Sequence, residues 1–143
     1  MEILAKVVYD EKDLARMFLP IGEMLQVSRV VQIVDGTIIG EKDISEQDWI
    51  FRLHFPGDPI FPGSLLIEGV GQVIAVWGWH SGLRGKPRLA KVSAEFKRPV
   101  MPTDRLIRYT GMMSKRNNII IGSVEITVGE WSIGRVHGSV VVV

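Results

Sequence analysis

GSLLIEGVGQVIAVWGW, residues 63–79, gives the clearest indication of the fold. At about 100° per residue its large apolar side chains cover most of the circumference of a helix: they are Leu65, Leu66, Ile67, Val70, Val73, Ile74, Val76 and Trp77. A helix on a protein surface has one apolar face, so this helix must be surrounded by the rest of the chain. Glu68 and Gln72 interrupt the stretch, which is shorter than the roughly 20 apolar residues that cross a bilayer. We therefore predict a buried central helix and no membrane partner.

Alternating patterns on both sides of this helix predict what surrounds it. Before the helix, residues 24–34 and 37–42 flank Asp35-Gly36, a pair typical of a hairpin turn. After it, strand patterns with short connections cover residues 88–98, 105–113, 118–128 and 131–142. Asp10 is suited to cap a short helix over residues 11–18. We expect an α+β fold in which a six-stranded antiparallel sheet wraps around one long central helix.

Length and composition bound the class of protein. With 143 residues, 46% of them hydrophobic and 23% charged, the chain is expected to form one globular domain over residues 1–143. Zero cysteines exclude a disulfide scaffold and a thiolate metal site. His80 and His137 have no partner at metal-ligand spacing, so we expect structural or solvated roles for them and no metal. The N-terminal residues lack a secretory signal pattern, and a cytoplasmic location is expected.

Small and polar residues form a stripe along the one side of the helix that large apolar residues leave free. The stripe consists of Ser64, Glu68, Gly71, Gln72, Ala75 and Gly78. A carboxylate in apolar surroundings costs several kcal/mol unless it is paired or protonated. Glu68 could be half of a buried ion pair, but the helix offers no neighbouring base. We therefore interpret Glu68 as a functional acid beside a space that a ligand can enter.

The loop before the helix is HFPGDPIFPG, residues 54–63, with three prolines and two glycines. This composition fixes a rigid loop, which presents His54 at one end and the helix N-terminus at the other. Taken alone, His54 would be interpreted as a structural loop histidine. Together with Glu68 and Gln72 in the following helix, it is better interpreted as a catalytic base.

The segment HFPGDPIFPGSLLIEGVGQ, residues 54–72, resembles the signature of the 3-hydroxyacyl-[acyl-carrier-protein] dehydratases of the FabA/FabZ type, which have the hot-dog fold. MLQVSRVVQIVDG, GEKDISEQDW and AEFKRPVMPTDRL are similar to the segments that flank the site in that family. The resemblance implies dehydration of (3R)-3-hydroxyacyl thioesters to trans-2-enoyl thioesters in fatty acid or polyketide-type biosynthesis. DISEQDW resembles the branch that also isomerises the product, whereas Glu68 resembles the simple dehydratases, so isomerase activity stays open.

Dehydration needs a base for the C2 proton, an acid for the leaving hydroxyl and a donor for the thioester oxygen. His54 is expected to be the base, and the resemblance implies that the Ile60 carbonyl orients its ring. Glu68 is expected to be the acid, with a pKa raised by apolar neighbours, and Gln72 to hydrogen-bond it. N–H groups at the helix start face the oxyanion. We assign substrate binding to Ile60, Phe61, Gly63 and Gln72, and expect no metal or organic cofactor.

The resemblance also implies partners. In the family, His54 of one subunit would meet Glu68 of its mate, so we expect a homodimer or a higher oligomer of dimers. Residues 1–70 hold 12 acidic and 6 basic side chains, and residues 71–143 hold 4 and 11. A solvated strand face would explain this surplus, but an acidic acyl carrier protein is also expected to dock there, on Lys97, Arg98, Lys115 and Arg116. Nucleic acid is disfavoured by a pI of only about 8.1.

Two other functions are compatible with the same residues. In a hot-dog acyl thioesterase, Glu68 would activate water for hydrolysis instead of protonating a hydroxyl. A non-catalytic hot-dog subunit would bind acyl chains without turning them over. Trp77, Trp79 and Phe61 are expected to belong to the core or to line an acyl tunnel, and the sequence does not give the length of the acyl chain.

Overall fold

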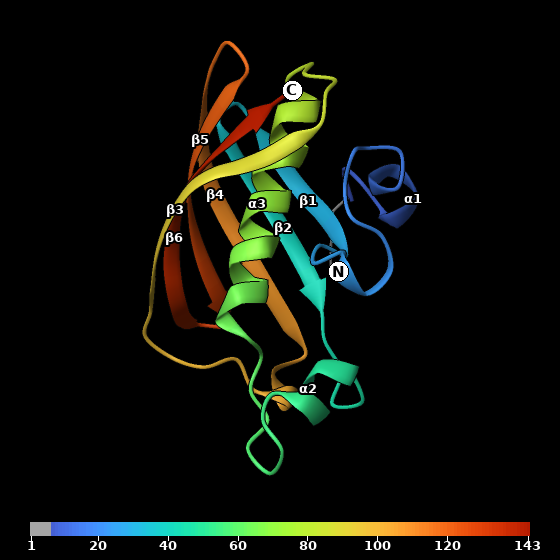
Figure 1. Cartoon of the computed structure of the whole chain (residues 1–143), viewed down its shortest axis with the longest axis vertical. Coiled ribbons are helices and arrows are strands. Elements are labelled where there is room, and N and C mark those ends of the chain that lie inside the picture. The colour runs from blue at the N-terminus through green and yellow to red at the C-terminus, as the bar shows by residue number, and fades with distance from the viewer. Residues whose placement is uncertain (1–6) are drawn as a thin grey trace, which may run out of the picture.

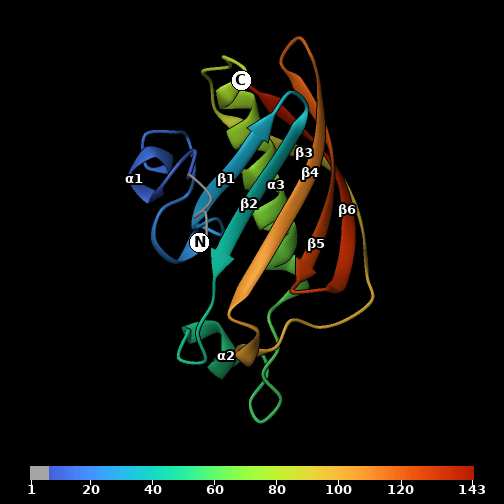
Figure 2. The same cartoon turned by 180° about the vertical axis from the view of Figure 1, so that it is seen from behind.

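A computed structural model describes residues 7–143 and confirms the expected α+β fold. One six-stranded antiparallel sheet, with the order β1-β2-β4-β5-β6-β3, curls around the helix α3 (Gly63–His80) (Figure 1). The strands are β1 (Arg29–Val34), β2 (Thr37–Asp43), β3 (Pro87–Phe96), β4 (Leu106–Arg116), β5 (Ile119–Val128) and β6 (Trp131–Val142). Seen from behind, β1, β2 and β4 pass across α3 and hide much of it (Figure 2).

The core lies between α3 and the inner face of the sheet. On α3, Val70, Val73 and Ile74 are almost completely buried, and strands on several sides supply the residues that cover them. The strand residues include Ile38, Ile107, Ile120, Val124 and Val136. The apolar circumference of residues 63–79 therefore predicted the wrapping correctly.

Element ends differ from the sequence pattern where turns intervene. Asp10 caps α1 (Glu11–Leu14) by accepting from the Asp13 N–H at 2.9 Å, but the helix ends at Leu14 rather than at residue 18. Residues 24–34 do not form one strand, because the 3₁₀ turn η1 (Gly22–Met24) precedes β1. Two further elements were not expected from the sequence pattern: α2 (Trp49–Leu53) and the 3₁₀ turn η2 (Pro102–Asp104).

The two edges of the sheet differ in whether another segment covers them. The β1 edge is covered, since Val30 and Tyr9 exchange backbone hydrogen bonds of 2.9 and 3.1 Å. Among residues 7–143, β3 pairs with β6 alone, and apolar side chains on β3 are exposed, among them Leu89, Val92 and Phe96. An open edge with exposed apolar side chains is a surface that pairs readily with another strand. No helix within residues 7–143 is long and apolar enough to span a membrane.

Close packing against the sheet fixes one turn of α3. Tyr109 on β4 is fully buried, and burial raises the pKa of its phenol. Its ring lies directly over Gly69: a Cβ added to Gly69 would overlap the hydroxyl and lie 2.7 Å from Cζ. Gly71, two residues later, faces open space, and its added Cβ would have no neighbour closer than 4.0 Å.

We expect Gly69→Ala to lower the free energy of unfolding by about 1–3 kcal/mol, because overpacking outweighs the better helix propensity of alanine. Gly71→Ala is the matched control, and it should raise this free energy by up to about 1 kcal/mol. Urea unfolding followed by circular dichroism measures both. Equal effects of the two substitutions would contradict the close packing of Tyr109 on α3.

Candidate active site

The loop that carries His54 is closed by hydrogen bonds at both ends. His54 follows α2 directly, and its N–H donates to the Ile50 carbonyl at 3.0 Å. Its Nδ1 lies 3.2 Å from the Ile60 carbonyl, and the Ile60 N–H donates to the His54 carbonyl at 2.8 Å. A carbonyl oxygen only accepts, so Nδ1 carries the proton and, in the neutral ring, Nε2 is free to accept one. This is the orientation that the family resemblance implied.

The next residues anchor this loop to the body of the protein. The Phe61 N–H donates to the Val100 carbonyl at 2.9 Å, and the buried Phe61 ring packs on Phe51 with a centroid distance of 6.1 Å. Pro62 then precedes Gly63, the first residue of α3. The first N–H groups of a helix have no acceptor within it, so they are available to an anionic oxygen. A side chain at position 63 would crowd Phe96, because an added Cβ would lie 3.0 Å from its ring.

A depression of about 320 Å³ lies between this loop and the end of β3. Three of the residues assigned to substrate binding, Ile60, Phe61 and Gly63, line it together with Lys97 and Arg98. The Arg98 guanidinium also lies over the Trp131 ring, 3.7 Å from its centroid, which fixes the charge near this opening. The structure therefore places one pair of the expected docking bases beside the helix N-terminus.

The other pair of expected docking bases lies elsewhere. Lys115 and Arg116 are the last residues of β4 rather than part of a turn, and the turn itself is Asn117-Asn118, with a φ of 57° at Asn117. This hairpin reaches the opposite end of the molecule from the His54 loop (Figure 1). Lys115 Nζ lies there 3.5 Å from the Ser81 carbonyl, just beyond the C-terminus of α3. The four bases do not form one patch.

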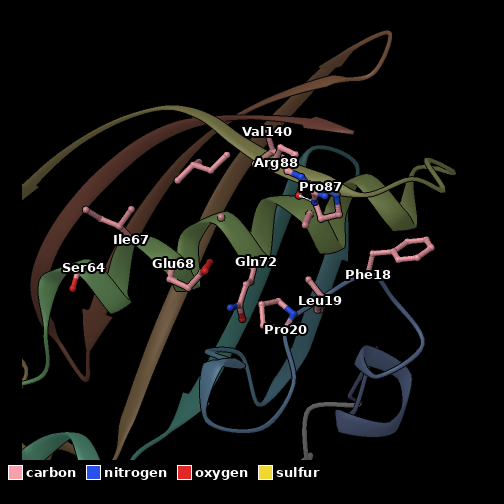
Figure 3. Close-up of a pocket in the computed structure, with 13 residues that line it drawn as sticks. Phe18, Leu19, Pro20, Ser64, Ile67, Glu68, Gln72, Pro87, Arg88 and Val140 are labelled. Atoms are coloured by element: carbon pink, nitrogen blue, oxygen red, sulfur yellow. Dashed lines mark hydrogen bonds between the residues drawn. The ribbon is translucent and has the colours of Figure 1, made fainter. Parts of the chain in front are cut away.

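Glu68 lies in a groove of about 520 Å³ that follows the small-residue stripe of α3 (Figure 3). One wall is formed by the segment Phe18 to Pro20, and the other by the beginning of β3 from Pro87 to Leu89. Along α3 the groove is lined by Ser64, Ile67, Glu68, Gly71, Gln72 and Ala75. Of the predicted stripe only Gly78 is elsewhere, packed against Ile120. Glu68 is half-buried and, across residues 7–143, forms no ion pair.

Gln72 does not hydrogen-bond Glu68, and that expectation was wrong. Its side chain is 2% exposed and is used by the backbone of the preceding segment: Oε1 accepts from the Gln26 N–H at 2.7 Å, and Nε2 donates to the Met24 carbonyl at 2.8 Å. Buried backbone groups that lie outside a sheet need such partners. Gln72 therefore fastens residues 24–26 to α3.

Within one subunit, His54 and Glu68 do not line a common cavity. His54 lies before the N-terminus of α3, whereas Glu68 is the sixth residue of that helix. The groove beside Glu68 and the depression beside Gly63 share no lining residue. The remaining histidines lie apart from both: the Tyr9 hydroxyl lies 2.7 Å from His80 Nδ1, and His137 is exposed on β6. The described part of the chain holds no group of three or more His, Cys, Asp or Glu side chains placed to bind a metal.

Comparison with known proteins gives the family of the chain. The family model of the FabA-like domain matches residues 19–137. The chain belongs to the FabA-like family. A curated relative, the 3-hydroxyacyl-[acyl-carrier-protein] dehydratase FabZ of Syntrophobacter fumaroxidans, is 34% identical over 110 residues, which cover 74% of this chain and 75% of the relative. FabZ of Symbiobacterium thermophilum is 32% identical over 110 residues, 74% of this chain and 78% of the relative.

Solved structures show the same fold at low identity. The dehydratase heterocomplex ApeI:P from Xenorhabdus doucetiae matches with a TM-score of 0.73 at 16% identity, covering 90% of both chains. A thioesterase from Haemophilus influenzae matches with a TM-score of 0.61 at 10% identity, covering 80% of this chain and 77% of that one. Among such distant neighbours the hot-dog fold is shared whatever the reaction, so the fold alone does not choose between dehydration and hydrolysis.

We expect Gln72→Leu to release the segment around residues 24–26 while the sheet stays folded, because the substitution removes both hydrogen bonds and puts an apolar side chain of similar size in the buried position. Amide hydrogen exchange in that segment should become about tenfold faster or more. Gln47→Leu, at an exposed glutamine before α2, is the control and should leave these amides unchanged. Unchanged exchange in Gln72→Leu would show that the amide does not fasten this segment.

Proposed function

We propose that this protein catalyses the reversible dehydration of (3R)-3-hydroxyacyl thioesters, carried on acyl carrier protein, to trans-2-enoyl thioesters. The observation that carries the proposal is the His54 ring, held by the Ile60 carbonyl with Nε2 free to accept a proton, in a FabA-like chain whose Glu68 faces a groove. The curated relatives named as dehydratases support the same reaction. Their name also supports a place in fatty acid or polyketide-type biosynthesis.

In the proposed mechanism, His54 Nε2 removes a proton from C2 of the substrate. The electron pair moves toward the thioester carbonyl, whose oxygen gains negative charge beside the Gly63 N–H and the helix dipole. The C3–O bond then breaks as Glu68 gives its proton to the leaving hydroxyl, which departs as water. A C2=C3 double bond forms without net oxidation, so the step needs no redox cofactor. Return of the proton from His54 to Glu68 restores both groups.

We propose that the complete site forms between two copies of the chain. This follows from the separation of His54 and Glu68 in one subunit, since neither lines the cavity beside the other. The open β3 edge, with Leu89, Val92 and Phe96 exposed beside it, supplies a self-complementary surface for an antiparallel pair. Pairing of the two β3 strands would place the second subunit beside the groove wall that β3 forms.

We propose that the acyl carrier protein docks near Lys97 and Arg98. These bases line the depression beside Gly63, next to the opening from which a thioester would reach the helix N-terminus. An acidic carrier would be steered to this position by charge. Lys115 and Arg116 lie at the opposite end of the subunit and have no part in this docking site.

We expect His54→Ala and Glu68→Gln each to lower the rate of crotonyl-thioester hydration by about 10²-fold or more, because each removes one proton-transfer group. Loss of enoyl absorbance measures the reaction. His137→Ala, at an exposed histidine on β6, is the control and should keep the wild-type rate.

The products of the same assay separate the alternatives. Wild-type rates in either active-site variant would contradict the proposal. Release of free thiol from crotonyl thioester without hydration of its double bond, lost in Glu68→Gln, would identify a thioesterase instead. An inert wild-type protein that still binds acyl thioesters would identify a non-catalytic subunit. Isomerase activity is measured in the dehydration direction: a 3-hydroxyacyl thioester is incubated with the protein, and chromatography of the enoyl product distinguishes the 2-enoyl from the 3-enoyl isomer.

A further inference from the structure

The groove beside Glu68 has an end. It follows α3 from Ser64 to Ala75, and there Leu19, Ala75 and Pro87 continue into a second cavity. That second cavity has only about 10 Å³, at the limit for a single water molecule. The side chains that fill the space beyond Ala75 are Met17, Trp79, Leu83 and Val142.

The end wall is firmly held. Trp79 lies one helical turn beyond Ala75 on the same side of α3, and the Arg84 guanidinium covers its ring at 3.7 Å from the centroid. Arg84 Nη1 also donates to the Trp79 carbonyl at 2.6 Å. Leu83, in the turn after α3, also belongs to the end wall, and its N–H donates to the Gly78 carbonyl at 3.0 Å. These contacts keep Trp79 from swinging out of the path of a long ligand.

The other aromatic residues on or near α3 play no part in this wall. Trp77 is turned away from the groove, and its Nε1 donates to the Asp35 carbonyl at 3.0 Å. Phe61 packs in the core on Phe51, and Phe96 covers Gly63 at the opposite end of the helix. Of the three aromatic residues expected from the sequence to line a tunnel or belong to the core, only Trp79 stands where a chain extending from Glu68 along the groove would end.

We propose that the end wall of Trp79, Leu83 and Met17 limits the acyl chain, and that the substrates are short and medium-chain 3-hydroxyacyl thioesters of up to about 12 carbons. The proposal rests on the proposed function, because it places the hydroxyl-bearing C3 beside Glu68 and the rest of the chain along the stripe toward Ala75. Ala75 and Trp79 are specificity-determining residues in this proposal.

The length follows from helix and chain geometry. Seven residues separate Glu68 from Ala75, which is about 10.5 Å at 1.5 Å per residue. An extended chain advances about 1.2 Å per bond, a third of the 3.3–3.6 Å spanned by the three backbone bonds of a residue. The groove therefore holds about nine bonds beyond C3, which corresponds to an acyl group of about 12 carbons. Each methylene buried before the wall should raise kcat/KM about fourfold.

The test measures kcat/KM for 3-hydroxyacyl carrier protein substrates of 4 to 16 carbons. It also measures, by calorimetry, binding of 3-hydroxyacyl-pantetheines of the same lengths to the inactive Glu68→Gln variant. For the wild type, kcat/KM should rise with acyl-chain length up to about 12 carbons and fall for longer chains. Ala75→Phe fills the end of the groove and should move the break to shorter chains. Trp79→Ala opens the wall and should move it to longer ones.

Trp77→Ala is the matched control, because it removes an indole from the same helix without changing the groove. The chain length beyond which kcat/KM falls should be the same in this variant as in the wild type. Thermal unfolding of each variant shows whether it is folded. If Trp79→Ala does not fold, the chain-length profile of Ala75→Phe tests the proposal by itself. Activity with the same break in wild type, Ala75→Phe and Trp79→Ala would overturn the chain-length proposal and leave the proposed reaction standing. If binding falls off beyond the expected chain length but the wild type shows no turnover, the chain-length proposal stands and the proposed reaction is contradicted.

Discussion

The structure depends on one constraint: α3 is apolar on most sides and must be enclosed. The sheet satisfies it by curling around the helix, and the buried side chains of α3 and of the strands form a continuous core. The part of the small and polar stripe from Ser64 to Ala75 lines an open groove instead, and this groove holds Glu68. The same packing that stabilises the fold therefore puts a carboxyl group beside an open space.

Each functional group is held by its surroundings rather than by its own segment alone. The Ile60 carbonyl fixes the His54 ring, and the hydrogen bond from Phe61 to Val100 ties the same loop to the body of the protein. Gln72 holds residues 24–26 against α3 by two hydrogen bonds to residues more than 40 positions earlier in the chain. Such rigid support is what a site needs when it must place a base, an acid and an oxyanion donor around one substrate.

Local patterns predicted what local physics decides. The buried helix, the strands after it and the rigid loop followed from periodicity and from proline and glycine, and the family resemblance supplied the Ile60 carbonyl as the partner of His54. Contacts between distant segments were not predictable in this way. Spacing of four residues suggested that Gln72 pairs with Glu68, but the backbone of Met24 and Gln26 binds its amide instead. The position of Lys115 at the far end of the subunit, and of Trp79 at the end of the groove, likewise depends on how the sheet curls.

In the proposed dimer, His54 of one copy works with Glu68 of another. The most direct measurement mixes His54→Ala and Glu68→Gln subunits in equal amounts, after unfolding and refolding them together, and compares the dehydratase rate with those of the separate variants. Random pairing makes half of the dimers mixed, and each mixed dimer has one intact site, so about a quarter of the wild-type activity should return. A mixture as inactive as its two components would place both groups in one subunit and contradict the account.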